Sequence, residues 1–289
     1  MPALPSNFAH TEYPELAVVM AIVNRTPDSF YDKGATFAEE AALAAVADAV
    51  AAGAQIIDIG GVKAGPGEHV DAAAEIDRVV PLIAQAHQHF PNVTLSVDTW
   101  RSDVAEQAIA AGATLINDTW AGHDPELLHV AGQHRVGYVC SHTGGAIPRT
   151  RPYRVHYDDV VAAVIAETTA LAERAVAAGV PENSILIDPT HDFGKNTFHG
   201  LELLRRVDEI VATGWPVLMA LSNKDFVGEA VGRSVEQRVA GTLAATAWAA
   251  ARGVAAFRAH HVAETVDVIR MTGAISGAAA PVQCVRGLV

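Results

Sequence analysis

The chain is poor in basic residues, in aromatic residues and above all in cysteine. Lys and Arg number 20 against 33 Asp and Glu, the formal net charge is −13, and no block of basic residues occurs. This balance argues against nucleic acid as a main partner. The two cysteines, Cys140 and Cys284, stand far apart in the sequence. They do not indicate a disulfide scaffold and favour a reducing compartment, the cytoplasm.

Long apolar runs are also missing. No apolar segment reaches the ~18 residues that are needed to cross a bilayer, and the first fifteen residues lack the basic start and apolar core of a signal peptide. We therefore expect a cytoplasmic protein without membrane contacts. Hydrophobic residues nevertheless make up 50% of the 289 positions, which is enough material for one large core.

Short apolar runs recur along the chain with a regular rhythm. The eight runs are 17–23, 56–58, 94–97, 114–116, 136–139, 185–187, 216–221 and 254–257. Ala-rich stretches with helical periodicity lie between them, and several end on glycine. Continuous apolar strands that alternate with helices predict a parallel sheet covered by helices. Eight repeats predict an α/β protein with a (β/α)8 TIM barrel. We expect one domain over 17–289, preceded by an N-terminal extension of residues 1–16.

In such a barrel the C-terminal ends of the strands build the active site. Asp98, Asn117 and Asp188 end strands three, four and six. Their side chains can accept hydrogen bonds from a flat, donor-rich heterocycle. One such residue could simply cap the next helix, but three at equivalent positions favour a binding role.

A second group of residues suits an anion. Lys224, Arg258 and His260 end strands seven and eight, where barrels often bind phosphate, although each could instead form a surface salt bridge. Asn24 ends strand one and suits an oxygen-preferring cation such as Mg²⁺ shared with phosphate. Ser222 has no evident His–Asp relay, so serine catalysis is not expected. The residues alone predict a heterocycle pocket beside a pyrophosphate pocket.

Three connections after strands are longer than the fold requires: 24–36, 62–70 and 141–157. Because each follows a strand, we expect all three on the active-site face. Long loops there commonly cover a substrate.

The same residues carry a specific resemblance. The segments 19–34, 56–61, 95–122, 185–196, 203–228 and 257–262 resemble dihydropteroate synthase, in order and over nearly the whole chain. The block N-x-T-P-D-S-F at 24–30 is the most specific part. Enzymes of this family join a dihydropterin-methyl pyrophosphate to p-aminobenzoate on the route to folate. The resemblance implies pterin and p-aminobenzoate-like ligands, Mg²⁺ as cofactor and a homodimer.

The resemblance also implies a role for each matching residue. Pterin binding is implied for Asp98, Asn117, Asp188, Phe193 and Lys224. Pyrophosphate binding is implied for Asn24, Arg258 and His260, with Mg²⁺ at Asn24. The resemblance implies that pyrophosphate leaves with the help of Mg²⁺ and that the aniline amine attacks the cationic methylene that remains. The residues implied in catalysis are Lys224, Arg258 and His260.

The second loop departs from the family. The family motif G-G-E-S-T-R-P-G is replaced by residues 60–67, where the threonine and arginine have become Ala64 and Gly65. A charge-assisted contact to phosphate is worth roughly 1.5–3 kcal/mol. Lys63 stands two positions earlier and lacks the bidentate fork of arginine.

Two further loops depart as well. In the family motif D-P-G-I-G-F-G-K, two glycines have become Thr190 and Asp192, and in S-R-K-S-F the arginine has become Asn223 and the second serine Asp225. Glycine permits a positive φ and the close approach of a flat ligand. The new side chains are expected to fill the pocket or to impose another backbone.

We interpret the chain as a divergent paralogue with weak or lost synthase activity. An active synthase whose loops find other contacts is one alternative. A methyl-folate transferase that works with a corrinoid protein needs no aminobenzoate site, but the N-x-T-P-D-S-F block argues against it. A non-catalytic ligand-binding paralogue is the third alternative.

Overall fold

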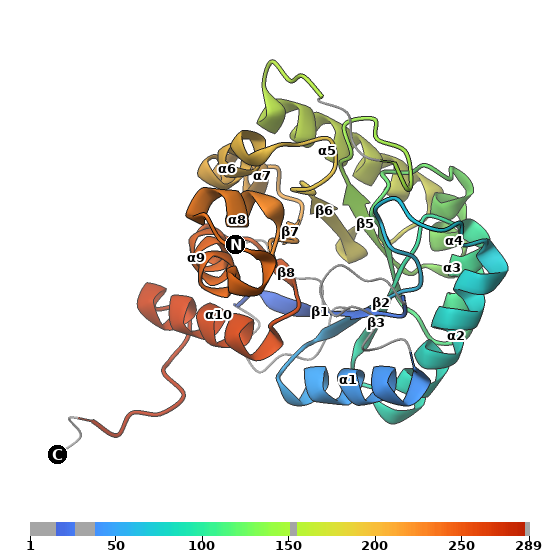
Figure 1. The fold of residues 1–289 in the computed structure, drawn as a ribbon, viewed down its shortest axis with the longest axis horizontal. Coiled ribbons are helices and arrows are strands. Elements are labelled where there is room, and N and C mark those ends of the chain that lie inside the picture. The colour runs from blue at the N-terminus through green and yellow to red at the C-terminus, as the bar shows by residue number, and fades with distance from the viewer. Residues whose placement is uncertain (1–15, 27–37, 151–154, 287–289) are drawn as a thin grey trace.

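Eight parallel strands form a single sheet in the order β6-β5-β4-β3-β2-β1-β8-β7 (Figure 1). The computed structural model describes residues 16–26, 38–150 and 155–286. The strands are β1 (Val18–Asn24), β2 (Ile56–Gly60), β3 (Thr94–Asp98), β4 (Leu115–Asp118), β5 (Gly137–Ser141), β6 (Ile185–Asp188), β7 (Leu218–Met219) and β8 (Ala256–Ala259). A bridge between Ile187 and Val217 joins the two end strands, β6 and β7. The sheet thus closes into the predicted TIM barrel.

Helices surround this ring of strands (Figure 1). They are α1 (Glu39–Ala51), α2 (Ala72–His89), α3 (Ser102–Ala110), α4 (Glu126–His134), α5 (Val160–Ala178), α6 (Thr197–Arg205), α7 (Val207–Val211), α8 (Asp225–Val231), α9 (Val239–Ala250) and α10 (Val262–Ser276). Short 3₁₀ turns, η1 (Glu182–Ser184) and η2 (Val235–Gln237), precede β6 and α9. No helix of the described residues combines the length and apolar character of a membrane crossing.

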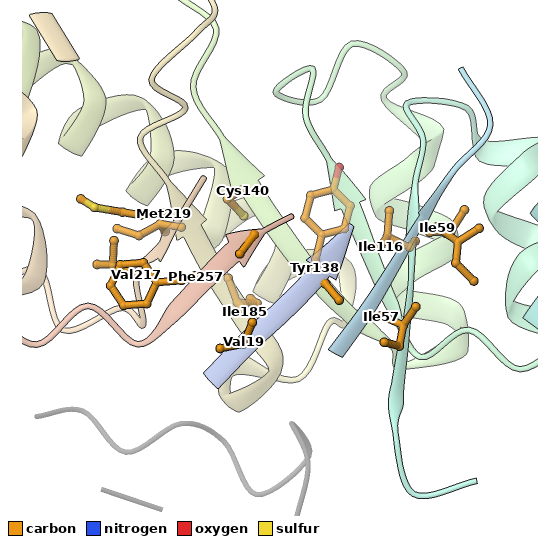
Figure 2. Close-up of a cluster of buried hydrophobic side chains, with 14 of the residues drawn as sticks. Val19, Ile57, Ile59, Ile116, Tyr138, Cys140, Ile185, Val217, Met219 and Phe257 are labelled. Carbon is orange, nitrogen blue, oxygen red and sulfur yellow. The ribbon is translucent and has the colours of Figure 1, made fainter. Parts of the chain in front are cut away.

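Side chains alternate between the two surfaces of the barrel wall. The inner cluster consists of Val18, Met20, Ile56, Leu115, Val139, Leu186, Leu218 and Ala256. Their strand neighbours, such as Val19, Ile57 and Phe257, belong to the larger cluster between strands and helices (Figure 2). Because the period of a strand is two residues, Asp58, Asn117 and Arg258 share the inner surface.

Glycines close several helices, as the sequence predicts. Gly112 follows α3 with φ of 118°, and Gly179 follows α5 with φ of 104°. Another glycine is needed for packing: a Cβ on Gly132 of α4 would stand 1.9 Å from the carbonyl oxygen of Ala178 in α5. Helices α4 and α5 therefore approach more closely here than any side chain would allow.

Three sequence expectations fall partly outside the described residues. The N-terminal extension 1–16 is described only at Leu16, the loop 24–36 only as far as Thr26, and the loop 141–157 everywhere except 151–154. The boundary at residue 17 stays a prediction.

Candidate active site

A cavity of about 380 Å³ opens at the C-terminal ends of the strands. It is lined by most of the residues that the sequence singles out: Asn24, Ala64, Gly65, Asp98, Asp192, Phe193, Lys224, Arg258 and His260. The other predicted residues, Asn117, Asp188, Thr190 and Asn223, are buried and lie outside this lining. The predicted site residues therefore fall into two groups: those that line the cavity, and those that are buried outside its lining.

Arg258 joins two carboxylates inside the barrel. Its Nε donates to Oδ2 of Asp58 at 2.6 Å, and its Nη2 donates to Oδ2 of Asp98 at 2.8 Å. The Thr119 hydroxyl donates to the other oxygen of Asp98 at 3.2 Å. The guanidinium of Arg258 is thus already paired with two carboxylates of the protein.

Asp58 is a central residue that the sequence reasoning missed. It is fully buried and accepts hydrogen bonds from the Ser96 hydroxyl at 2.6 Å and from the Asn117 amide at 2.9 Å, in addition to Arg258. A carboxylate within the apolar run of β2 is the signal that could have revealed it, because a buried charge needs a partner. Asn117 uses its amide nitrogen here, while its Oδ1 is buried without a hydrogen bond among the described residues.

Burial disfavours the charge on two predicted pterin ligands. Burial raises the pKa of Asp98 to about 7, against the opposing effect of Arg258. Burial also raises the pKa of Asp188 to about 6, against the backbone N–H of Thr190 that donates to Oδ1 at 2.7 Å. Raised carboxyl pKa values inside a cleft are typical of binding and catalytic sites.

Lys224 is paired with a residue that is foreign to the family motif. Its Nζ forms an ion pair and hydrogen bond with Oδ2 of Asp192, one of the two positions where a glycine of the motif is replaced. Both side chains line the cavity, and they are 20% and 36% exposed, respectively. The lysine that the resemblance assigns to the substrates therefore already has an anionic partner.

His260 lies against Ser222, which also lines the cavity. The Ser222 hydroxyl is 3.0 Å from Nδ1 of His260 and accepts from the His260 backbone N–H at 3.2 Å. Burial, followed by the nearby Arg258, lowers the pKa of His260 to about 3. His260 is thus neutral at pH 7, and its role in pyrophosphate binding stays a prediction.

The second loop forms one side of the cavity and is held from outside. Arg149 donates to the carbonyl oxygens of Lys63 at 3.0 Å and of Glu68 at 2.5 Å. Ala64 and Gly65 face the cavity between these two anchors, and a Cβ on Gly65 would meet nothing within 4 Å. Space for a longer side chain exists at position 65, but the chain places no charge there.

The loop after β6 keeps a glycine-like backbone without the glycine. Thr190 has φ of 51°, a left-handed conformation that is rare for a β-branched residue. Its hydroxyl donates to the carbonyl oxygen of Asp188 at 3.2 Å and accepts from the His142 N–H at 3.4 Å. Thr190 thus imposes no other backbone, and it is Asp192 that fills the pocket.

Lys195 holds the C-terminal part of the loop after β6 by hydrogen bonds. Its Nζ lies 2.8 Å from Nδ1 of His142 and donates to the carbonyl oxygens of His142 and Phe193, each at 3.1 Å. The Phe193 ring packs on Trp120 with centroids 4.4 Å apart. Phe193 is therefore presented to the cavity by a fixed loop.

Asn223 is turned away from the cavity. It is fully buried with φ of 57°, and its side-chain nitrogen lies 3.2 Å from Nε2 of His261. Asn tolerates this backbone better than most residues. The motif position that carries arginine in the family contributes no charge to the lining here.

The residues present do not form a metal cage of their own. No group of three His, Cys, Asp or Glu side chains suited to a metal ion occurs in the described residues. Asn24 supplies one neutral oxygen at the cavity wall, and Asp98 is bonded to Arg258 and Thr119. Mg²⁺ is usually held by one or two carboxylates together with substrate phosphates. A magnesium ion here would therefore need phosphate oxygens from a ligand beside Asn24.

Comparison with known proteins identifies the family. The family described as pterin binding enzyme matches residues 20–260. The chain is 60% identical over 275 residues to a Mycobacterium leprae protein named inactive dihydropteroate synthase 2, with 94% of each chain covered. The chain belongs to the dihydropteroate synthase family. This membership confirms the resemblance and disfavours the methyl-folate transferase alternative.

Two solved dihydropteroate synthases are similar in structure and in sequence. One, from Yersinia pestis in a sulfonamide drug complex, has a TM-score of 0.86 and 36% identity, with 91% of this chain and 95% of that chain covered. Another, from Xanthomonas albilineans with 4-aminobenzoic acid, has a TM-score of 0.82 and 40% identity, with coverage of 92% and 94%. The synthase fold is thus intact around the altered loops.

Proposed function

We propose that the chain is a pterin-binding protein of the dihydropteroate synthase family whose synthase activity is lost or strongly impaired. The observation that carries this proposal is the ion pair between Asp192 and Lys224 inside the cavity. A lysine acts on a substrate only when its charge or its amine is available. Here a carboxylate on the adjacent loop occupies it.

Retained pterin binding is supported by the buried half of the site. A pterin presents ring N–H and amino donors, and Asp98, Asn117 and Asp188 carry oxygens at the ends of β3, β4 and β6. The Asn117 Oδ1 is buried without a hydrogen bond among the described residues. A buried acceptor of this kind is stabilised when a ligand donates to it.

Impaired handling of pyrophosphate and aminobenzoate is supported by the open half. Position 65 carries no side chain beside the cavity, and Ala64 lacks a hydroxyl. Removing one charge-assisted contact weakens anion binding by roughly 1.5–3 kcal/mol. The loss is greater where the contact acts mainly in the transition state. We include p-aminobenzoate-like molecules among the ligands, bound more weakly than in an active synthase.

Three finer points are also part of the proposal. Any remaining Mg²⁺ binding would use Asn24 together with phosphate oxygens, and it would disappear without the phosphate. Cys140 and Cys284 are both unbonded thiols, which supports the cytoplasm as the compartment. A homodimer is supported by an open apolar groove between α6, α8 and α9, whose lining includes Leu204, Val231 and Trp248.

A synthase assay with dihydropterin pyrophosphate and p-aminobenzoate tests the main proposal. We expect turnover at least about a hundredfold below the ~10 s⁻¹ that is ordinary for enzymes. Restoring the family residues in Ala64→Thr/Gly65→Arg/Thr190→Gly/Asp192→Gly should raise kcat/KM at least about tenfold, because the arginine returns and Lys224 is released. Ala64→Thr/Gly65→Arg alone serves as the matched partial variant.

Two outcomes would contradict the proposal. Wild-type turnover within about tenfold of 10 s⁻¹ would identify an ordinary active synthase. No gain in the fourfold variant, with its fold verified by circular dichroism, would show that the altered loops are not the cause.

A further inference from the structure

We propose that Asp192 makes this cavity select pterins whose substituent at C6 is neutral or cationic, and reject those that carry phosphate or carboxylate there. The proposal rests on the pterin binding proposed above and assigns the charge class of the ligand. Asp192 is then a specificity-determining residue and not merely a lost glycine.

The geometry places two carboxylates where a family member would meet an anion. Asp192 and Asp225 both line the cavity beside Lys224. Asp192 engages Lys224 directly, whereas Asp225 accepts from Nη1 of Arg238 at 2.8 Å and is 77% exposed. An incoming anion must therefore separate Lys224 from Asp192 and leave that carboxylate uncompensated, or lie beside a lysine whose charge Asp192 already neutralises.

Besides Lys224, the cations of the lining are Lys63 and Arg258, and Lys63 lies on the second loop, two positions before the residue that the family motif gives as arginine. Arg258 spends its Nε and Nη2 on Asp58 and Asp98. His260 is neutral at pH 7, since burial and Arg258 lower its pKa to about 3. Position 65 contributes no cation. Asp98, Asp192 and Asp225 offset the cations of the lining, so the carboxylate that pairs with Lys224 decides which charge on the ligand is favoured there.

The size of the cavity brings the C6 substituent within reach of this charge. A volume of about 380 Å³ is at the small end of ligand pockets. Asp98 and Asp192 line the same space, so a pterin held at Asp98 carries its substituent in the field of Asp192. A protonated amine there can form a charge-assisted hydrogen bond, which is worth about tenfold in affinity or more.

Three pterins of similar size test the selection: 6-aminomethylpterin, 6-hydroxymethylpterin and 6-carboxypterin, which are cationic, neutral and anionic at pH 7. Calorimetry gives each Kd, and the fluorescence of Trp120, which contacts the cavity residue Phe193, gives an independent signal. We expect the aminomethyl compound to bind at least about tenfold more tightly than the carboxy compound. The hydroxymethyl compound should lie between them.

Two variants assign this order to Asp192. Asp192→Asn keeps the shape and should reduce the cation-to-anion ratio at least about tenfold. Asp192→Gly should invert the ratio, because it releases Lys224. Asp77→Asn, an exposed residue of α2 outside the cavity lining, makes the same change in net charge and should leave the ratio unchanged.

The outcomes separate this inference from the proposed function. Pterin binding with the anionic compound preferred, or a ratio that Asp192→Asn leaves unaltered, overturns the inference while the proposed function stands. Absence of binding by all three pterins overturns both. Melting curves of each variant show whether a lost signal reflects unfolding.

Discussion

Asp188 holds a carboxyl group where its charged form is disfavoured, and this has a measurable consequence. Burial raises the pKa of Asp188 to about 6. Between the unfolded carboxyl pKa near ~4 and pH ~6, the folded chain binds more protons than the unfolded chain. The contribution of Asp188 to stability therefore falls as the pH rises through this window.

Asp188→Asn removes that contribution while its amide oxygen can still accept from the Thr190 N–H. The free energy of unfolding of this variant, taken relative to that of the wild type, should be larger by about 2 kcal/mol at pH 7.5 than at pH 4.5. Urea titrations across this range measure the difference. Asp77→Asn is the control for an exposed carboxylate, and two parallel profiles for wild type and Asp188→Asn would refute the assignment.

The residues at strand ends could be predicted from the sequence, whereas their partners could not. Asp98, Lys224 and Arg258 follow apolar runs, so their position at the rim is a matter of chain order. The pairing of Arg258 with Asp58 joins positions 200 residues apart, and it depends on which side chains share the inner surface of the closed barrel. Strand periodicity alone leaves that choice open.

At the scale of elements, the loop after β6 has a positive φ at a position where the family motif has glycine and this chain has threonine. Thr190 keeps a positive φ because its N–H is bonded to Asp188 and its hydroxyl to the carbonyl of the same residue. Such strain amounts to about 1–3 kcal/mol and persists where the surroundings determine the turn. The sequence showed that Thr190 and Asp192 depart from the family motif. It did not show that Thr190 would have a strained backbone or that Asp192 would line the cavity.

The contact between α4 and α5 provides a second test at this scale. Gly132→Ala would place a methyl carbon 1.9 Å from the Ala178 carbonyl oxygen, and this oxygen belongs to the backbone of α5 and cannot rotate away. The helices must separate, and overpacking of this kind destabilises by about 1–3 kcal/mol or more. Denaturant midpoints should fall accordingly.

Gly65→Ala is the matched control for this test, because its added Cβ meets nothing within 4 Å. Its midpoint should stay close to that of the wild type. Equal midpoints for Gly132→Ala and the wild type would mean that α4 and α5 lie further apart than described.

At the scale of the whole molecule, the eightfold rhythm of the sequence was sufficient to predict the barrel. Eight apolar runs separated by helices allow few other folds, and the glycines at helix ends gave approximate boundaries. The rhythm did not reveal that β7 would consist of only Leu218–Met219 or that its link to β6 would be a single bridge. Those features depend on the contacts between β6 and β7, which form only when the sheet closes into a barrel.

Assembly is the remaining question at this scale. Val231 lines the apolar groove between α6, α8 and α9 and is 50% exposed. If the proposed homodimer forms there, Val231→Glu should weaken the dimer at least about tenfold, because a charge would be buried in an apolar interface. Analytical ultracentrifugation over a range of concentrations gives the dissociation constant.

Ile147→Glu is the control for the dimer, since Ile147 is 56% exposed and lies outside this groove. A wild-type chain that sediments as a monomer at all concentrations would contradict the dimer. Equal effects of the two substitutions would place the interface elsewhere.

The contact between β6 and β7, where a single bridge closes the barrel, bears on the role of Asp192. Asp192 follows β6 and Lys224 follows β7, so their ion pair spans the joint that a single bridge otherwise closes. A single exposed ion pair contributes up to about 1 kcal/mol to stability. This pair, however, links the ends of two strands that are otherwise joined by one bridge. Replacing Asp192 with glycine should therefore release Lys224 and at the same time remove one of the links between the ends of β6 and β7.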